Sequence, residues 1–214
     1  MKIDKVKIFP LVAAMTIIAA VAAALLGWVY LVTAAPIKNA QIQKTNAALR
    51  DVLPAFDNQP GDEAVTAGNV TFYTARNAGK IVGFAGETVT PKGYNGGITV
   101  LAGLTPDGKI TTVLVTQQAE TPGLGTVVTD RKRQKTISGI LSGAQESGLP
   151  PNRVLDQFSG MQVNAGDVPW TVKKDGGTLD AVTGATITSR AVADAVYTIA
   201  ATFTNNRDAI INAQ

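Results

Sequence analysis

Neither cysteine nor histidine occurs among the 214 residues of the sequence. Their absence excludes a thiol nucleophile, a disulfide, a Cys/His zinc site, a histidine-ligated haem and an iron–sulfur cluster. A Ser-His-Asp triad is excluded for the same reason. Any chemistry must therefore come from carboxylates, hydroxyls, backbone amides or a bound cofactor.

Charged residues are also scarce, at 16 %, whereas soluble domains usually contain about a quarter. The excess of positive charge lies in the first 38 residues, which contain Asp4 and the lysines Lys2, Lys5, Lys7 and Lys38. Since the whole chain has 19 basic and 16 acidic residues, the remaining 176 residues contain fifteen of each. A neutral domain lacks the broadly basic surface that binds nucleic acid, so no nucleic-acid partner is expected.

An uncharged stretch runs from Ile8 to Ile37. It is longer than the about 20 residues that cross a bilayer and longer than the roughly 7–15-residue apolar core of a signal peptide. Residues 8–36 are therefore predicted to be an uncleaved transmembrane helix. A cleaved signal is the alternative, because a cut after Ala35 satisfies the small-residue rule, although Pro36 would then follow the cut directly.

The orientation of this helix follows from its flanks. Three lysines within residues 1–7 predict a cytoplasmic N-terminus by the positive-inside rule. Trp28 and Tyr30 suit the outer membrane–water interface. The sequence therefore predicts a single-pass protein of the cytoplasmic (inner) membrane, with the rest of the chain on its periplasmic or extracellular side.

The chain beyond the anchor is predicted to be α+β, with an antiparallel sheet and flanking helices. Residues 37–56 are assigned to a linker helix, whose periodic part, 39–53, stops before Pro54, and residues 57–214 to the domain. The predicted strands are Val70–Ala75, Ile81–Glu87, Ile98–Leu104, Ile110–Thr116 and Val168–Val172. Turns at Asn77-Ala78-Gly79 and Thr105-Pro106-Asp107-Gly108 join the first four strands in pairs. Helices are predicted over 136–148 and Ala191–Phe203.

The sharpest motif is the stretch from Asp180 to Ser189, just before the last predicted helix. One interpretation is a helix cap, with the hydroxyl of Thr183, Thr186 or Ser189 accepting a free amide of the first turn. The other is an anion site, because the unpaired N–H groups at a helix N-terminus suit a phosphate. Small neighbours leave the Thr186 hydroxyl open. No histidine is present to activate this hydroxyl, so it suits a covalent acceptor better than a catalytic nucleophile.

A second motif is the loop Glu120-Thr121-Pro122-Gly123-Leu124-Gly125-Thr126. Its proline and two glycines predict a stiff loop, in which the backbone can approach a ligand closely. An ordinary connecting loop fits the same residues. The spacing matches neither a Walker phosphate loop nor the dinucleotide-binding pattern.

Taken together, the motifs resemble the G subunit of the Rnf electron-transport complex and, more distantly, the C subunit of the sodium-pumping NADH:quinone reductase. Both share an extracytoplasmic FMN-binding domain. The resemblance covers nearly the whole chain. It rests on an N-terminal anchor and on Val52-Leu53-Pro54, Gly93-Tyr94-Asn95-Gly96, Asp107-Gly108-Lys109-Ile110, Glu120–Gly125, Gly176-Gly177 and Asp180–Val192.

The resemblance implies that Thr186 carries FMN through a phosphoester bond made by a dedicated flavin transferase, which reads the acidic residue matching Asp180. It also implies an electron-transfer subunit with little turnover alone, in a complex that couples electron flow between ferredoxin and NAD to Na⁺ or H⁺ movement. The implied partners are the other Rnf subunits, the transferase and the lipid bilayer.

The cofactor residues implied by the resemblance come from both motifs. Around Thr186 they are Asp180, Thr183, Gly184 and Ala185, and beside the isoalloxazine ring they are Glu120, Thr121, Gly123, Leu124 and Gly125. Leu124 is expected to pack on the ring. Glu120 either contacts the flavin or holds the loop by accepting backbone N–H bonds.

Other residues near the motifs are expected to be structural. Tyr94 and Trp170 are interpreted as core residues more readily than as flavin contacts. Arg190 either reaches the phosphate or stays exposed on its helix. Lys173 and Lys174 are expected at the surface, beside a turn at Asp175-Gly176-Gly177.

One segment departs from the family pattern, because residues 127–151 read as an insertion. Its basic run, Asp130-Arg131-Lys132-Arg133-Gln134-Lys135, is expected to form a solvated helix face. A contact with lipid head groups or an acidic partner subunit is the other interpretation.

Two alternatives to the Rnf interpretation stay open. One is a subunit like the C subunit of the NADH:quinone reductase, or a stand-alone anchored FMN carrier. The other is a cofactor-free extracytoplasmic binding or scaffold domain, in which the Asp180–Ser189 stretch is only a helix cap.

Overall fold

A computed structural model describes residues 5–131, 149–164 and 166–212. The chain divides into two compact units, Met1–Lys44 and Thr45–Gln214. The predicted helix over 136–148 and most of the basic run lie outside the described residues.

The first unit consists of most of helix α1, which spans Lys5–Val52 and thus runs on into the second unit. From Phe9 onward α1 contains an exposed apolar stretch with a mean hydropathy of 2.4 over 18 residues, so it is long and apolar enough to cross a membrane. The hydroxyls of Thr16 and Thr33 donate to the carbonyls of Val12 and Val29, both at 2.8 Å. These polar groups are therefore satisfied within the helix, as an apolar environment requires.

Helix α1 continues through Pro36, so the predicted membrane helix and linker helix form one element. It ends at Val52, two residues before Pro54, whose ring disfavours helical geometry in the residue ahead of it. The last two turns belong to the second unit, in which Leu49 and Val52 are buried.

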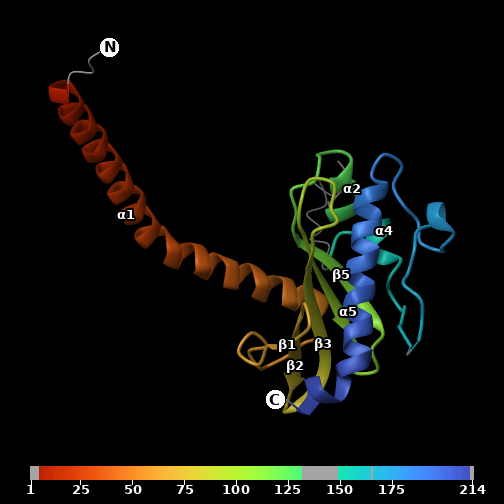
Figure 1. Ribbon diagram of the computed structural model, residues 1–214. Helices are drawn as coiled ribbons and strands as arrows, with labels where there is room; N and C mark the ends of the chain where they lie inside the picture. Colours follow the sequence, from red (N-terminus) through yellow and green to blue (C-terminus); the bar gives the residue numbers. More distant parts are fainter. Residues whose placement is uncertain (1–4, 132–148, 165, 213–214) are drawn as a thin grey trace, which may run out of the picture. The chain divides into compact units, whose positions relative to one another are not determined.

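The second unit is built on a five-stranded antiparallel sheet in which every strand pairs with its neighbours in the sequence (Figure 1). The strands are β1 (Val65–Ala67), β2 (Val70–Asn77), β3 (Lys80–Thr90), β4 (Ile98–Leu104) and β5 (Ile110–Gln117). The four predicted strands from Val70 to Thr116 are confirmed, and β1 is an addition.

Local turn chemistry explains the tight hairpins. Ala78 and Gly79 adopt positive φ values of 50° and 76° between β2 and β3. Gly108, at φ 87°, donates its N–H to the Thr105 carbonyl at 2.9 Å between β4 and β5. Glycine adopts this left-handed geometry without steric penalty, which is why the turn residues predict both hairpins correctly.

Helix α5, Thr186–Asn212, covers one face of the sheet (Figure 1). Phe203 of this helix packs its ring against Phe72 and Phe84, at centroid distances of 5.8 and 4.9 Å. Such tilted aromatic pairs add to the free energy gained by burying the rings. The predicted helix Ala191–Phe203 is thus confirmed and extended at both ends.

The opposite face of the sheet receives the end of α1. Leu49, Val52 and Leu53 form a second buried cluster with sheet residues that include Tyr73 and Leu101. Burial, together with the Glu87 carboxylate that accepts its hydroxyl at 3.0 Å, raises the pKa of Tyr73. This side of the sheet therefore combines an apolar cluster with a polar contact.

The described residues between β5 and α5 include three short helices: α2 (Gly125–Thr129), α4 (Arg153–Asp156) and the 3₁₀ helix η1 (Lys173–Asp175). The sequence predicted none of them, because a single turn contains no periodic pattern. The predicted strand Val168–Val172 is wrong, since only an isolated bridge joins Val172 to Leu179. Within the part of the chain that the structure describes, no strand pairs with the remaining residues of 168–172.

The two ends of the predicted insertion are held by buried polar side chains. Asn152 accepts the N–H groups of Val154 and Leu155 at the start of α4, and its amide donates to three carbonyls at the end of α2. The Arg131 guanidinium, with only 7 % of its side chain exposed, pairs with Asp156 at 2.7 Å and donates to the Val113 and Pro150 carbonyls. The prediction of a solvated basic face is therefore wrong for Arg131.

Close packing of α5 on the sheet generates a stability prediction. A Cβ built on Gly86 of β3 overlaps Ile199 of α5 and approaches the Phe72 ring to 3.0 Å. We predict that Gly86→Ala lowers the free energy of unfolding by about 1–3 kcal/mol, because an added methyl group overpacks this contact. Gly61→Ala is the matched control, since its Cβ meets only Asn46 at 3.8 Å. Thermal unfolding of the full chain in detergent measures both, and equal stability of the two variants would contradict the prediction.

Candidate functional site

Thr186 is the first residue of α5. Gly184, with φ at 84°, turns the chain into the helix, and Ala185 donates its N–H to the Val182 carbonyl at 3.0 Å. The residue before the helix is thus Ala185, whose side chain has no oxygen. The prediction that Thr183, Thr186 or Ser189 caps the helix is wrong for this reason.

The start of α5 leaves hydrogen-bond donors free. Ser189 closes the preceding turn, because its hydroxyl accepts the Val182 N–H at 3.2 Å and donates to the Ala185 carbonyl at 3.0 Å. Within the described part of the chain, the N–H groups of Thr186, Ile187 and Thr188 have no hydrogen-bond acceptor. These amides and the positive end of the helix dipole suit a negatively charged group.

Thr186 lies in an open cleft of about 440 Å³, here called the Thr186 cleft. Its lining comes from four segments of the chain: Tyr94, Glu120, Thr121, Leu124, Gly125, Lys174, Gly184, Ala185, Thr186, Ile187 and Thr188. The cleft thus brings the two sequence motifs together. Three other predicted site residues, Gly123, Thr183 and Asp180, are not part of the lining.

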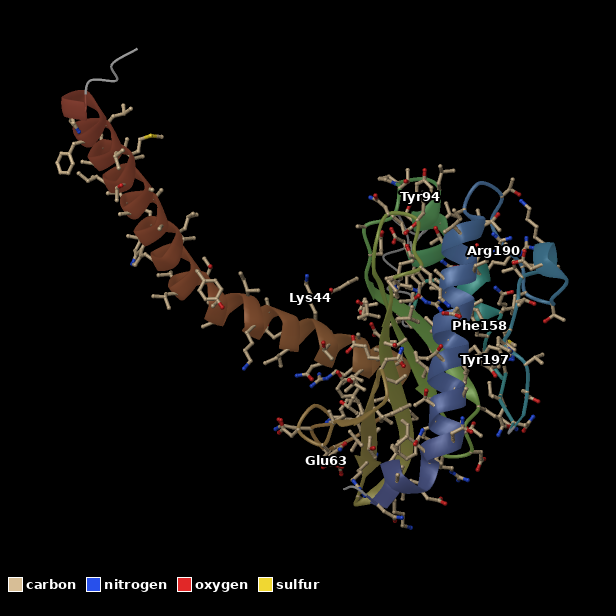
Figure 2. The ribbon with its side chains drawn as sticks, viewed as in Figure 1. Lys44, Glu63, Tyr94, Phe158, Arg190 and Tyr197 are labelled. Carbon is tan, nitrogen blue, oxygen red and sulfur yellow. The ribbon has the colours of Figure 1, made fainter. Side chains whose placement is uncertain are left out.

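Three large apolar side chains on this lining are exposed to solvent. Tyr94 is 67 % exposed, Leu124 47 % and Ile187 46 %. Figure 2 shows Tyr94 at the end of the domain where Arg190, near the start of α5, also lies. The prediction of Tyr94 as a core strand residue is wrong, because it lies in the loop between β3 and β4. Apolar groups gathered around a cleft are a typical lining for a planar ring.

Glu120 is the only buried carboxylate in the described lining of the cleft, with 4 % of its surface exposed. It accepts the Thr188 hydroxyl at 2.5 Å and the Asn95 N–H at 3.1 Å. A Cβ on Gly93 would approach Glu120 to 2.8 Å, and one on Gly125 would overlap it. The carboxylate therefore joins both loops to α5, and glycine is required where they pass it.

Gly123 and Thr126 shape the rest of this loop. Gly123 has φ at 78°, a conformation that residues with a Cβ rarely adopt, and its N–H donates to the Thr126 hydroxyl at 2.9 Å. Leu124 lies beside the chain at Gly184, where an added Cβ would come within 3.2 Å of it. Glycine at both positions lets the two motifs approach each other.

Asp180 lies outside the cleft lining and borders a neighbouring cavity of about 510 Å³. Its backbone N–H donates to the Gln157 amide oxygen at 2.7 Å, and its carboxylate pairs with Lys173 at 2.7 Å and Arg153 at 2.9 Å. Lys173 foremost, and then Arg153, hold the pKa of Asp180 below its ordinary value. The group therefore stays ionised near neutral pH.

Arg190 does not line the Thr186 cleft. Its guanidinium donates to both carboxylate oxygens of Asp175, at 2.5 and 2.6 Å, and lowers the pKa of that carboxyl. Trp170 is partly buried, with its ring 6.2 Å from Phe158 and 5.6 Å from Tyr197. These contacts agree with the interpretation of Trp170 as a core residue.

Sequence reasoning did not single out Ile187, Thr188 or Lys174 as site residues. Ile187 and Thr188 follow Thr186 directly, so a helix that starts at Thr186 could have indicated that they lie at the same site. Lys174 had no such signal, because η1 brings it to the cleft from a separate segment.

Comparison with known proteins agrees with this geometry. Residues 93–201, which contain the whole lining of the Thr186 cleft, match the family of the FMN-binding domain. The chain is 34 % identical to the G subunit of the ion-translocating oxidoreductase complex of Pasteurella multocida (strain Pm70) over 192 residues, 85 % of this chain and 86 % of the relative. It is 33 % identical to the corresponding protein of Methanosarcina acetivorans over 201 residues, 91 % of this chain and 93 % of that relative.

A shorter match points the same way. The G subunit of Shewanella baltica (strain OS223) is 37 % identical over 141 residues, 65 % of this chain and 58 % of the relative. Matches of this length, together with the FMN-binding domain, show that the chain belongs to the G-subunit family of the ion-translocating oxidoreductase complexes.

Proposed function

We propose that this flavoprotein subunit holds FMN covalently, as a phosphoester of Thr186, and relays electrons within an Rnf-type ion-translocating complex. The FMN-binding domain and the G-subunit relatives support the flavoprotein and its place in such a complex. The position of the Thr186 hydroxyl, beside free helix-start amides and within the apolar cleft, carries the covalent assignment.

The donors and the lining of the Thr186 cleft fit FMN. The N–H groups of Thr186, Ile187 and Thr188 supply a seat for one negatively charged phosphate. Tyr94, Leu124 and Ile187 supply exposed apolar surface for a planar ring. Gly184 and Gly125 keep the backbone close to this space, because neither presents a side chain to it.

Bound FMN supplies the redox chemistry, since it accepts one or two electrons and can join carriers of different stoichiometry. Side chains and backbone amides of the chain would bind and orient it. Leu124 would pack against the ring and exclude water, and the amides at the start of α5 would hold the phosphate. Glu120 fixes the loop that carries Leu124 through its bonds to Thr188 and Asn95.

The orientation of the chain in the membrane and its partners are part of the proposed function. The lysines of residues 1–7 support a cytoplasmic N-terminus, and the flavin domain then lies on the periplasmic or extracellular side of the cytoplasmic membrane. The other subunits of the complex deliver and remove electrons there, between ferredoxin and NAD overall. A flavin transferase that reads Asp180 makes the covalent bond.

Two alternatives make different predictions. A cofactor-free scaffold domain would use the start of α5 as a fold element only, and its purified protein would be colourless. A role in the NADH:quinone reductase is disfavoured, since the relatives that cover most of the chain are named as G subunits of ion-translocating oxidoreductase complexes.

The covalent anchor is tested by Thr186→Val. We predict that this substitution abolishes flavin fluorescence in a denaturing gel of the full chain from its own membranes, because valine keeps the shape but removes the hydroxyl that bonds the phosphate. Thr178→Val, an exposed threonine eight residues earlier, is the control and keeps the signal. Peptide mass mapping locates the FMN. Flavin that survives denaturation of Thr186→Val would place the anchor elsewhere.

Recognition by the transferase is tested by Asp180→Asn. We predict a severalfold lower fraction of protein with covalent FMN when chain and transferase are co-produced, because the charge is lost while the shape and the backbone bond to Gln157 remain. Asp175→Asn is the matched control, since it also removes a paired carboxylate, at the last residue of η1. Intact-mass measurement gives the fraction, and equal loading of both variants would refute the role of Asp180.

The buried hydrogen bond of Glu120 is tested by Thr188→Val. We predict a loss of about 1.5–3 kcal/mol in the free energy of unfolding, because a buried carboxylate loses its hydroxyl donor. Thr198→Val on the same helix is the control. Its hydroxyl only donates to the Asp194 carbonyl one turn earlier, so a smaller loss is expected. Denaturant unfolding of both variants decides, and similar losses would argue against the role of this contact.

A further inference from the structure

The 3₁₀ helix η1 presents three consecutive side chains to three different surroundings. With three residues per turn, neighbouring side chains on such a helix point about 120° apart. Lys173 pairs with Asp180 at 2.7 Å, and Asp175 pairs with Arg190. The residue between them, Lys174, lines the Thr186 cleft.

The backbone holds this arrangement in place. Lys173 donates its N–H to the Leu179 carbonyl at 2.8 Å, and Asp175 donates to the Val172 carbonyl at 2.8 Å. Gly176 ends the helix with φ at 84°. Lys174 therefore reaches the cleft from a segment that is fixed on both sides.

Lys174 is the one cation in the described lining of the Thr186 cleft. Lys173, Arg190 and Lys92 lie nearby, and each already pairs with an aspartate. The only carboxylate on the described lining, Glu120, accepts hydrogen bonds from the chain itself and is therefore occupied.

The Lys174 ammonium group makes no ion pair or hydrogen bond among the described residues. Its charge does help to lower the pKa of Asp175, but Arg190 binds that carboxylate directly and has the larger effect. The charge of Lys174 is therefore available to a ligand in the cleft.

We infer that Lys174 supplies the positive charge that neutralises the bound flavin, an inference that rests on the proposed function. FMN brings negative charge in two places. Its phosphate is anionic, and each electron that enters the ring adds negative charge unless a proton follows. An ammonium group within the cleft stabilises the anionic phosphate and so favours FMN binding. It also raises the reduction potential of the flavin, because it stabilises the more negative, reduced form.

The first test uses the full-length chain produced without a flavin transferase. Lys174→Gln weakens FMN binding by about two- to fivefold, the range of one solvent-exposed ion pair, as measured by quenching of FMN fluorescence. Lys109→Gln makes the same charge change just before β5, at the opposite end of this strand from the cleft. At about 3.4 Å per residue, β5 separates Lys109 from the cleft by about 25 Å, so FMN binding is expected to be unchanged. Lys174→Arg retains the wild-type affinity.

The second test uses the chain loaded with covalent FMN and measures the midpoint potential by dye-equilibrated titration. The midpoint potential of Lys174→Gln is expected to be lower than that of the wild type and lower than that of Lys109→Gln.

Riboflavin, which lacks the phosphate, separates the two sources of negative charge in the binding assay. A loss confined to FMN assigns Lys174 to the phosphate, and a loss shared by riboflavin assigns it to the ring.

The outcomes separate this inference from the proposed function. If wild-type chain takes up FMN while Lys174→Gln matches Lys109→Gln in both affinity and potential, the role of Lys174 is overturned and the flavin site stands. If wild-type chain from its own membranes carries no FMN, the proposed function fails and the inference with it.

Discussion

The Thr186 cleft depends on one buried contact, the hydrogen bond from the Thr188 hydroxyl to the Glu120 carboxylate. The loops that carry Tyr94 and Leu124 expose these side chains, so neither loop gains much from apolar burial of its own. The hydrogen bonds of the buried Glu120 carboxylate hold these loops in place instead. Hydrogen bonds to a carboxylate are stronger than neutral ones and are costly to break. Glycine at 93 and 125 leaves room for the carboxylate between the loops.

Helix α5, which carries Thr188, is held in place by its packing on the sheet. Its middle packs on the sheet through Ile199, opposite Gly86, and through Phe203 between two sheet phenylalanines. Its first turn carries Thr186 and Thr188. A cofactor attached to Thr186, as proposed, would therefore be held by an element that is packed on the sheet, whereas the loops across the cleft expose Tyr94 and Leu124. This division suits an electron carrier, which must hold its flavin in one place and still expose it to partners.

Paired charges surround the cleft, while its lining is largely uncharged. Among the described residues, Asp175, Asp180 and Asp194 each bind a basic side chain. Exposed pairs of this kind contribute little to stability. Their effect here is to hold η1 and α4 against their neighbours and to leave Lys174 as the free cation of the described lining. Tyr94, Leu124 and Ile187 supply exposed apolar surface in the same cleft.

The sequence by itself determined the long apolar N-terminal helix, the four strands with their Gly-containing turns, the last helix and the two motifs of the site, because each rests on local periodicity or turn chemistry. Tertiary structure alone decided which of these residues meet. Glu120 finds Thr188 across 68 positions, Lys174 reaches the cleft through a single 3₁₀ turn, and Arg131 is buried against Asp156 rather than solvated. The wrong strand at 168–172 and the exposed Tyr94 have the same cause, since propensity describes a residue's own backbone and not the partner that packing provides.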